Sequence, residues 1–388
     1  MPSGGVFPAK AKAFTGEKIR EETLMDLNQK LLEVCRLFRI DYQYLGYETI
    51  QMGNVNRTYK VNFLLPEGNP KSFLVQNVNT YAFRNPVGLM ENIDKVTEHI
   101  RQKKPGQLAL HFHHTEDRKT YVADGANFWR MTNYVPSVTY NTASDLAVVR
   151  NAGMAFGEFQ MDLADFDIGE LTETIPGFHN TRQRYQKLLD SIREDRAGRV
   201  SQVREEIDYL LSVQDLACRL TDMQMAGELP LRVTHNDTKI NNVLFHPETK
   251  EAMIVIDLDT VMPGLMGHDF GDAIRFAANY VEEDCPEYDK VGVNLDVFRA
   301  FAEGFLSKTA LTMTEAEAGT LALSCFVLTA ELATRFLADY LDGDLYFKIN
   351  SPDHNLVRTR CQIALARDML RKMDQMDQIV RDCMEAAK

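Results

Sequence analysis

Residues 232–260, "RVTHNDTKINNVLFHPETKEAMIVIDLDT", constrain the fold of this chain more than any other stretch. A polar loop at 235–242 is followed by two apolar runs, "NVLF" and "AMIVIDLD", which the polar turn "HPETKE" joins. Short apolar runs on either side of a turn predict a β-hairpin. Because a hairpin folds back on itself, Asp257 at the end of the second run should return to the neighbourhood of Asp237 and Asn242. We therefore expect three oxygen-bearing side chains to converge.

Two aspartates and an asparagine placed together suit phosphoryl transfer, in which catalysis consists of positioning and of neutralising phosphate charge. Asp237 would accept the proton of the acceptor hydroxyl, while Asn242 and Asp257 hold a magnesium ion, which prefers hard oxygen ligands. Lys239 would reach the γ-phosphate of the donor as a point charge. The spacing H-x-D-x-K-x-x-N is typical of kinase catalytic loops. Any one of these residues alone is more commonly part of a polar turn that binds its own backbone.

Four neighbouring polar residues have more than one interpretation. His235 is expected to pack under the loop as a structural residue rather than to act in catalysis. Asp259 is either a second carboxylate for the metal or substrate, or a turn residue at the end of the strand. Asp269 and Asp272 stand near the start of a helix predicted from "GHDFGDAIRFAANYV". Carboxylates there can cap unpaired N–H groups, and we favour capping over direct chemistry.

Strand and helix patterns along the 388 residues predict an α+β protein with two lobes. Residues 1–22 are rich in Gly, Pro, Ala and Lys and are expected to form a flexible N-terminal arm. Residues 23–136 begin with a helical pattern and continue with alternating runs, which predict a small antiparallel β-sheet with one inserted helix. Residues 137–388 are mainly helical. A cleft between the lobes is the expected ligand site.

The composition disfavours several partners and locations. A net charge of −13 without a basic cluster would repel a polyphosphate backbone, so nucleic acid is not expected as a partner. Six cysteines stand far apart, as in a reduced cytoplasmic protein rather than a disulfide scaffold or a zinc site. We find no signal-peptide core and no apolar run of roughly 18 residues, and therefore expect neither export nor a membrane. No obligate protein partner is evident.

The chain resembles the aminoglycoside phosphotransferase-like kinases, a superfamily with a bilobal protein-kinase-like fold. Within that superfamily it looks most like the bacterial N-acetylhexosamine 1-kinases. The resemblance runs from about residue 25 to the C-terminus. It is densest in "LTETIPGFH", "LRVTHNDTKINN", "IDLDTVMPG", "DFGDAIRF", "RFLADYLDGDLYF" and "HNLVRTR".

This resemblance implies a reaction and a cofactor set. The donor would be ATP, with Asp237 as catalytic base and with Asn242 and Asp257 as ligands of Mg²⁺. The acceptor would be the anomeric (C1) hydroxyl of N-acetylglucosamine or N-acetylgalactosamine, giving the sugar 1-phosphate and ADP. That hydroxyl is more acidic than an ordinary alcohol, so an aspartate of modest basicity suffices as base.

The segment "QMGNVNRTYK" at 51–60 stands where a loop covering the phosphates would lie. By itself it reads as an ordinary hairpin turn with a single glycine. The resemblance raises Asn54, Asn56 and Thr58 as phosphate contacts, through side chains or backbone N–H groups.

The third predicted strand departs from the general kinase pattern. It carries Gln76 near the place where kinases usually have a lysine that pairs the α- and β-phosphates. Gln76 remains a candidate nucleotide contact, and Arg57 or Lys239 is expected to supply the missing charge.

The segment "RMTNYVPS" at 130–137 is the expected hinge between the lobes. Taken alone it is a plain linker. In a kinase, the backbone around Asn133 and Val135 would also meet the adenine, and both interpretations can hold.

The candidate sugar contacts lie towards the C-terminus. Arg335 and Asp339 stand four apart on a predicted helix, and Tyr346 lies in the turn that follows. Spacing alone favours a solvated salt bridge between Arg335 and Asp339. A neutral sugar needs fixed donors and acceptors and an apolar face, and the resemblance favours sugar contact by Arg335 and Tyr346. Asp237 and Asp259 are the carboxylates expected on the substrate side.

Rival functions remain open from the sequence. The first keeps the kinase chemistry but replaces the sugar with choline, an aminoglycoside or another hexose. A cationic acceptor would suit an acidic protein, although the arginine at 335 argues against a cationic pocket. The second is a nucleotide-binding regulator without turnover, which the joint presence of the three oxygen-bearing side chains disfavours. A protein kinase is disfavoured because Leu258 and Asp259 replace Phe-Gly after Asp257.

Overall fold

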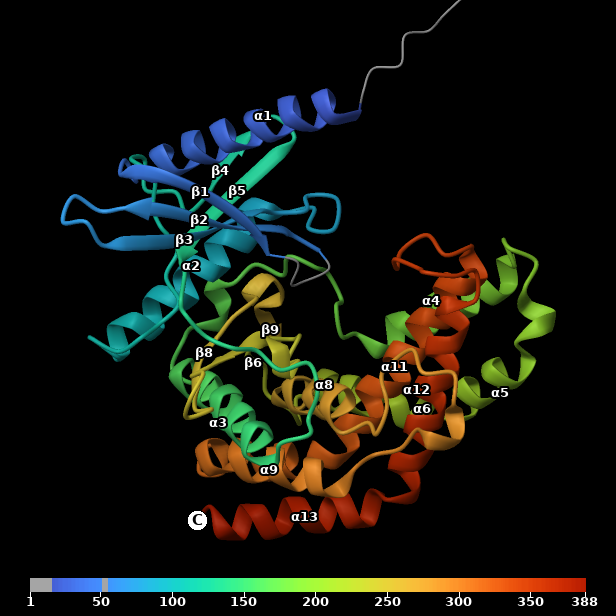
Figure 1. Cartoon of the computed structure of the whole chain (residues 1–388). Coiled ribbons are helices and arrows are strands. Elements are labelled where there is room, and N and C mark those ends of the chain that lie inside the picture. The colour runs from blue at the N-terminus through green and yellow to red at the C-terminus, as the bar shows by residue number, and fades with distance from the viewer. Residues whose placement is uncertain (1–15, 51–54) are drawn as a thin grey trace, which may run out of the picture. The chain divides into compact units, whose positions relative to one another are not determined.

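The computed structural model describes the backbone of residues 16–50 and 55–388, and their side chains from residue 27 onward. The chain forms two compact units, and Figure 1 labels many of their helices and strands. Unit 1 comprises Met1–Ala82 and Phe112–Tyr134, and unit 2 comprises Phe83–His111 and Val135–Lys388.

Unit 1 is a five-stranded antiparallel β-sheet in the order β1-β2-β3-β5-β4, with helix α1 packed against it. Residues 1–15 of the predicted arm lie outside the described residues, and α1 begins at Gly16. The elements of unit 1 are α1 (Gly16–Leu37), β1 (Gln43–Ile50), β2 (Arg57–Leu64), β3 (Pro70–Asn77), β4 (Val122–Asp124) and β5 (Asn127–Asn133).

The core of unit 1 follows from the alternation of apolar residues in the strands. Tyr59, Val61 and Phe63 on β2 are buried, as are Phe73 and Val75 on β3. Because side chains at every second position of a strand share a face, these residues form one apolar surface. Helix α1 covers that surface and completes the cluster.

Unit 2 is mainly helical and carries two small two-stranded sheets. Together with the sheet of unit 1, this composition confirms the predicted α+β fold class. The helices of unit 2 are α2 (Pro86–Lys103), α3 (Leu146–Asp162), α4 (Thr181–Glu194), α5 (Arg204–Ser212), α6 (Gln214–Ala217), α7 (Arg219–Met225), α8 (Met266–Ala277), α9 (Leu295–Thr309), α10 (Glu315–Ala318), α11 (Leu321–Asp342), α12 (His354–Arg371) and α13 (Met373–Ala386).

Helix α11 is the central helix of unit 2 and packs against α4, α8 and α12. By length and hydropathy it would suffice to cross a membrane, but 83% of its most apolar window is buried inside the protein. Burial on nearly all sides explains its apolar composition, because a helix surrounded by other helices needs no polar face. The few charged residues that it carries therefore need a specific explanation.

Helices α3 and α9 approach closely enough to require glycine. A Cβ atom at Gly304 would lie 2.1 Å from the carbonyl oxygen of Arg150, and one at Gly153 would lie 2.3 Å from that of Phe301. Real Cβ atoms cannot approach a backbone oxygen so closely, so the two glycines permit the crossing. The crossing places Phe156 of α3 edge-on to His235, with ring centroids 5.6 Å apart.

The predicted hairpin is present. Strands β7 (Val243–Phe245) and β8 (Ala252–Val255) pair antiparallel. Strand β6 (Arg232–Thr234), which precedes this hairpin in the chain, pairs with β9 (Met262–Gly264), which follows it. The N–H of Ile256 donates to the carbonyl of Asn242 at 2.9 Å. The backbone next to Asp257 therefore lies against the end of the polar loop.

Helix α2, expected in the N-terminal lobe, groups with unit 2. The side chain of Asn92, 1% exposed, holds it there. Its Nδ2 donates to the carbonyls of Thr172 and Val261 at 2.7 and 3.0 Å, and its Oδ1 accepts from the N–H of Thr172 at 2.8 Å. Because Val261 follows the short 3-10 helix η4 (Leu258–Thr260), α2 is tied to the segment that begins at Asp257.

Replacing Asn92 with alanine should therefore destabilise unit 2. Three hydrogen bonds are lost and buried backbone groups are left without partners, at about 1 kcal/mol or more for each bond. We expect the free energy of unfolding in urea to fall by about 3 kcal/mol. Glu91→Ala, on the exposed side of the same helix, should change it by less than about 0.5 kcal/mol, and equal effects of the two substitutions would contradict the assignment.

Candidate active site

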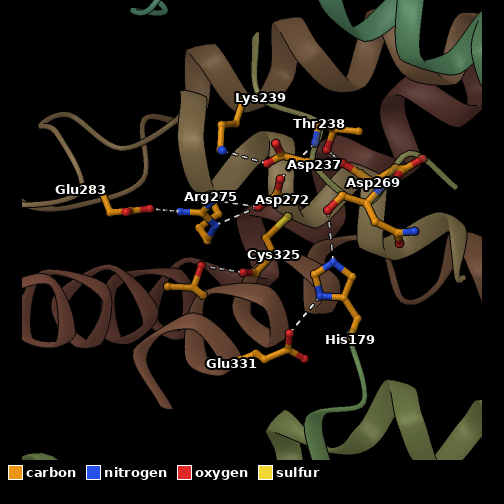
Figure 2. A network of polar contacts seen from close by, with 12 residues as sticks. His179, Asp237, Thr238, Lys239, Asp269, Asp272, Arg275, Glu283, Cys325 and Glu331 are labelled. Carbon is orange, nitrogen blue, oxygen red and sulfur yellow. Dashed lines mark hydrogen bonds and ion pairs between the residues drawn. The ribbon is translucent and has the colours of Figure 1, made fainter. Parts of the chain in front are cut away.

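The polar loop after β6 is held by carboxylates of helix α8. Asp269 accepts hydrogen bonds from the backbone N–H of His235 and Asn236, at 3.0 and 2.7 Å. Asp272 accepts from the N–H of Thr238 at 3.0 Å. Figure 2 shows this network around Asp237. The expectation that Asp269 and Asp272 cap their own helix is therefore wrong, because their oxygens bind the N–H groups that the loop turns inward.

Two residues that the sequence did not single out support these carboxylates. Gln160 of α3 donates to Asp269 at 2.5 Å. Arg275, 5% exposed, donates to Asp272 at 2.8 and 3.0 Å and to Glu283 at 2.6 Å. Burial raises the pKa of Asp269, and the hydrogen bonds that it accepts act in the opposite direction. A buried carboxylate with three donors is stable because its charge is compensated.

Asp237 is the residue that this framework presents outward, with 27% of its side chain exposed. Lys239 lies 2.9 Å from its Oδ1. The Nδ2 of Asn242 donates to the backbone carbonyl of Asp237 at 2.8 Å and to its Oδ2 at 3.2 Å. The structure thus brings together three of the residues predicted from the loop.

The electrostatics of this group favour an ionised Asp237. Burial acts to raise the pKa of the carboxyl, but the charge and hydrogen bond of Lys239, together with the charge of Arg275, bring it below its ordinary value. The charge of Asp237 in turn raises the pKa of Lys239. At neutral pH the pair is therefore a carboxylate and an ammonium, and the carboxylate is available as a proton acceptor.

The donor set beside Asp237 fits a hard divalent cation. The side-chain nitrogen of Asn242, Nδ2, donates to Asp237. The side-chain oxygen of Asn242, Oδ1, is therefore the atom that can face an ion. Asp257 is exposed and adopts a left-handed backbone conformation, with φ 61°. Among the described residues, no group of three or more His, Cys, Asp or Glu side chains could hold a metal ion alone. A cation here would take further oxygens from phosphate and water.

His235 and Asp259 are both buried. The Nε2 of His235 donates to the carbonyl of Ile256 at 2.8 Å, and its Nδ1 accepts from the N–H of Asp237 at 3.2 Å. His235 therefore packs under the loop, as predicted. Asp259 lies in the short helix η4, two residues after Asp257. Its role as a substrate carboxylate stays a prediction.

Within unit 1, two of the candidate residues, Thr58 and Gln76, form a row across adjacent strands with Arg130. Gln76 donates through Nε2 to Oγ1 of Thr58 at 3.1 Å, and its Oε1 accepts from Nε of Arg130 at 2.9 Å. Arg130 is 2% exposed and was not predicted. The register of β3 and β5, which pairs Gln76 with Arg130, could not be read from the sequence. It places the guanidinium of Arg130 next to the position where kinases usually have a lysine.

The other nucleotide candidates have the following positions. Asn56 accepts from the N–H of Asn79 at 3.0 Å, and Asn54 lies outside the described residues. Asn133 ends β5, and its Oδ1 lies 3.1 Å from Nε2 of His113. The carbonyl of Val135 accepts from the hydroxyl of Ser137 at 2.9 Å. Their contact with a nucleotide stays a prediction.

On the predicted sugar side, Arg335 and Asp339 form no ion pair with each other in the described part of the chain. Asp339 instead accepts from the N–H groups of residues 345–347, at 2.8 to 3.0 Å. The guanidinium of Arg335 stacks between the rings of Phe178 and Phe347, at 5.4 and 5.5 Å. Tyr346 is 71% exposed. The salt bridge that spacing favoured is therefore wrong, because Asp339 fixes the turn that carries Tyr346.

Comparison with known proteins identifies a family and solved structures with this fold. Residues 47–299 match the phosphotransferase enzyme family. An aminoglycoside phosphotransferase from Alicyclobacillus acidocaldarius subsp. acidocaldarius DSM 446 has 12% identity and a TM-score of 0.62, with 90% of this chain and 96% of that chain covered. A microcompartment-associated aminopropanol kinase has 14% identity and a TM-score of 0.60, with coverages of 90% and 98%.

A third solved structure is the amicoumacin kinase hAmiN in complex with AMP-PNP, Ca²⁺ and Ami. It has 13% identity and a TM-score of 0.55, and the alignment covers 90% of this chain and 96% of that one. Identities of 12–14% establish a shared fold and leave the acceptor open.

The contacts of Asp237 predict how its pKa responds to mutation. Lys239→Met removes the largest interaction that opposes the effect of burial, so the pKa of Asp237 should rise by about one to three units. Titration of the ¹³C-labelled carboxyl by NMR measures this directly. Lys250→Met, which removes an exposed pair with Asp145, should leave the pKa of Asp237 unchanged. An unchanged value in Lys239→Met would show that the ion pair does not govern the carboxylate.

Proposed function

The chain belongs to the phosphotransferase enzyme family, and from that premise we propose that it transfers the γ-phosphate of ATP to the anomeric hydroxyl of N-acetylhexosamines. The products would be the sugar 1-phosphate and ADP. The observation that carries the proposal is the grouping of Asp237, Lys239 and Asn242 on a loop fixed by α8.

In this proposal Asp237 accepts the proton of the sugar hydroxyl as the oxygen attacks the phosphorus. Its lowered pKa keeps it ionised at neutral pH, and the relative acidity of an anomeric hydroxyl compensates for its weak basicity. Lys239 lies 2.9 Å from the carboxylate and would also contact the γ-phosphate. The carbonyl oxygen of Asn242 and the carboxylate of Asp257 would hold Mg²⁺, which neutralises charge on the phosphate oxygens when bound. A related fold that binds AMP-PNP with Ca²⁺ supports a divalent cation and an adenine nucleotide as partners.

The nucleotide site would draw on the row of polar residues in unit 1. Gln76 cannot supply the positive charge that a lysine would offer to the phosphates. We propose that Arg130, which donates a hydrogen bond to Gln76, supplies this charge in place of Arg57. Thr58, Asn54 and Asn56 would contact phosphate, and the backbone at Asn133 and Val135 would meet the adenine.

The acceptor site would be formed by Arg335 and Tyr346, with Asp259 as a further carboxylate. The rings of Phe178 and Phe347 restrict the movement of the Arg335 guanidinium, and recognition of sugar oxygens requires donors held in place. The exposed ring of Tyr346 offers an apolar face. Six free thiols fit a reducing cytoplasm, where ATP and free sugars are available.

An amino alcohol or aminoglycoside acceptor is the second candidate. The net charge of −13 favours a cation, and two solved structures of the same fold act on such acceptors by their names. Against it stands the arginine placed on the acceptor side, which would repel an ammonium group.

The central test offers purified protein ATP and Mg²⁺ with N-acetylglucosamine, N-acetylgalactosamine, glucose, galactose or choline. Phosphorus NMR reports the product. We expect a glycosyl phosphate from the N-acetyl sugars, and Asp237→Asn should lower the rate by a factor of about 10²–10⁴, the range for a lost general base. Asp208→Asn, an exposed aspartate of α5, should keep wild-type activity. Phosphorylation of choline alone would reject the sugar assignment.

The role of Arg335 can be tested by a matched pair of substitutions. Arg335→Lys removes a planar donor and should raise the KM for the N-acetyl sugar by a factor of about 10 to 100, as expected for a lost charge-assisted hydrogen bond. The KM for ATP should stay within twofold of wild type, roughly the scatter of near-neutral substitutions. Arg358→Lys changes an arginine that stacks on Phe336 in the same way and serves as control. An unchanged sugar KM in Arg335→Lys would place the acceptor elsewhere.

A further inference from the structure

Two histidines form hydrogen bonds with the peptide group that joins Asn236 to Asp237, one with its N–H and one with its carbonyl. Its N–H, from Asp237, donates to Nδ1 of His235 at 3.2 Å. Its carbonyl, from Asn236, lies 3.3 Å from Nε2 of His179. Asn236 has a left-handed backbone with φ 63°, a conformation that asparagine adopts more readily than most other residues with a side chain. Rotation of this peptide plane would move the carboxylate of Asp237.

The two histidines must differ in protonation. His235 donates through Nε2 to a carbonyl and accepts an N–H at Nδ1, so it carries one ring proton and is neutral. His179 faces acceptors at both nitrogens: the carbonyl of Asn236, and Oε1 of Glu331 at 2.9 Å from Nδ1. A carbonyl and an ionised carboxylate can only accept hydrogen bonds. Both bonds form together only if both ring nitrogens of His179 carry protons.

The surroundings of His179 support an imidazolium ion. Its side chain is 8% exposed and that of Glu331 is 2% exposed, so each charge compensates the other in a buried place. Burial acts to raise the pKa of Glu331, but the charges of His179, Arg335 and Arg184 lower it to about 2. The second oxygen of Glu331 accepts from the hydroxyl of Thr181 at 2.7 Å.

A further titratable neighbour is His268 of α8, whose ring centroid lies 4.8 Å from that of His179. Burial and the charge of His179 lower the pKa of His268 to about 3. Its Nδ1 accepts from the N–H of Leu265 at 3.3 Å. His268 is therefore neutral and does not repel the charge on His179. Figure 2 shows His179 between Glu331 and the catalytic loop.

We propose that His179 and Glu331 are positioning residues for Asp237: Glu331 keeps His179 doubly protonated, and His179 holds the Asn236 carbonyl so that the catalytic carboxylate stays in its working orientation. This inference rests on the proposed function for its kinetic consequence and on hydrogen-bond geometry for the protonation state. It also explains why α11, an apolar core helix, carries a buried glutamate at this point.

The protonation state is tested first, on the wild-type protein with ¹⁵N-labelled histidine. Ring-nitrogen NMR at neutral pH should show two protonated nitrogens for His179, identified by the signals that His179→Gln removes. His354 is the matched control: it is also buried and lies 3.1 Å from a carboxylate, Asp284, but its Nδ1 accepts the N–H of Asn350. It should show one protonated and one unprotonated nitrogen. A single ring proton on His179 would overturn the inference.

The positioning role is tested with Glu331→Gln, which removes the charge with little change of shape. In this variant His179 should lose one ring proton, and kcat should fall by a factor of about 10 to 100, as expected when a reacting group is displaced by up to about 1 Å. The KM for ATP should change less than about twofold. Asp284→Asn should leave kcat unchanged.

A wild-type kcat in Glu331→Gln with one ring proton on His179 would overturn the positioning role. A lowered melting temperature of Glu331→Gln would show that kcat falls because the variant loses structure. In that case the ring-nitrogen spectrum of the wild-type protein decides the inference. Absence of phosphoryl transfer by the wild-type protein to any acceptor would reject the proposed function, while the ring-nitrogen signals would remain an independent answer.

Discussion

The rest of the site depends on the hydrogen bonds that the carboxylate of Asp269 accepts from the loop after β6. The loop after β6 runs without a strand partner, so its inward N–H groups need acceptors other than a β-ladder. Asp269 takes the N–H groups of His235 and Asn236, and Asp272 takes that of Thr238. With its neighbours turned inward in this way, Asp237 faces outward. A buried carboxylate normally destabilises a fold, but three donors compensate Asp269.

Much of this site could be predicted from the sequence because its first contacts are local. Asn242 lies five residues after Asp237, and the hairpin that returns Asp257 has a turn signal and two apolar runs. The same reasoning failed for Asp269 and Asp272. Helix starts attract carboxylates for capping, and nothing in the sequence shows that these carboxylate oxygens instead accept backbone N–H groups 33 or 34 residues earlier.

Longer-range partnerships were also invisible to the sequence. Arg130 meets Gln76 only through the register of β3 and β5, and Glu331 meets His179 across 152 positions. Hydrogen bonds between distant side chains leave no periodicity to detect. Arg335 was recognised by resemblance alone, since its spacing from Asp339 pointed to a salt bridge that the turn at 345–347 prevents. Helical spacing therefore predicted proximity but not pairing.

Helix α11 connects the two sides of the proposed acceptor site within unit 2. One turn carries Glu331, which binds His179 beneath the catalytic loop, and the next carries Arg335, stacked between Phe178 and Phe347. Phe178, which contacts Arg335, and His179, which would position the proposed base, are adjacent in the chain. Tight coupling between acceptor binding and base orientation is the expected consequence.

The most direct test of this account is the structure of the protein with a non-hydrolysable ATP analogue, Mg²⁺ and N-acetylglucosamine. We expect the anomeric oxygen to lie within about 3.2 Å of the Asp237 carboxylate. We also expect Asn242 and Asp257 oxygens at about 2.1 Å from the cation. A sugar bound with its anomeric hydroxyl away from Asp237, or a cation held by neither residue, would contradict this account.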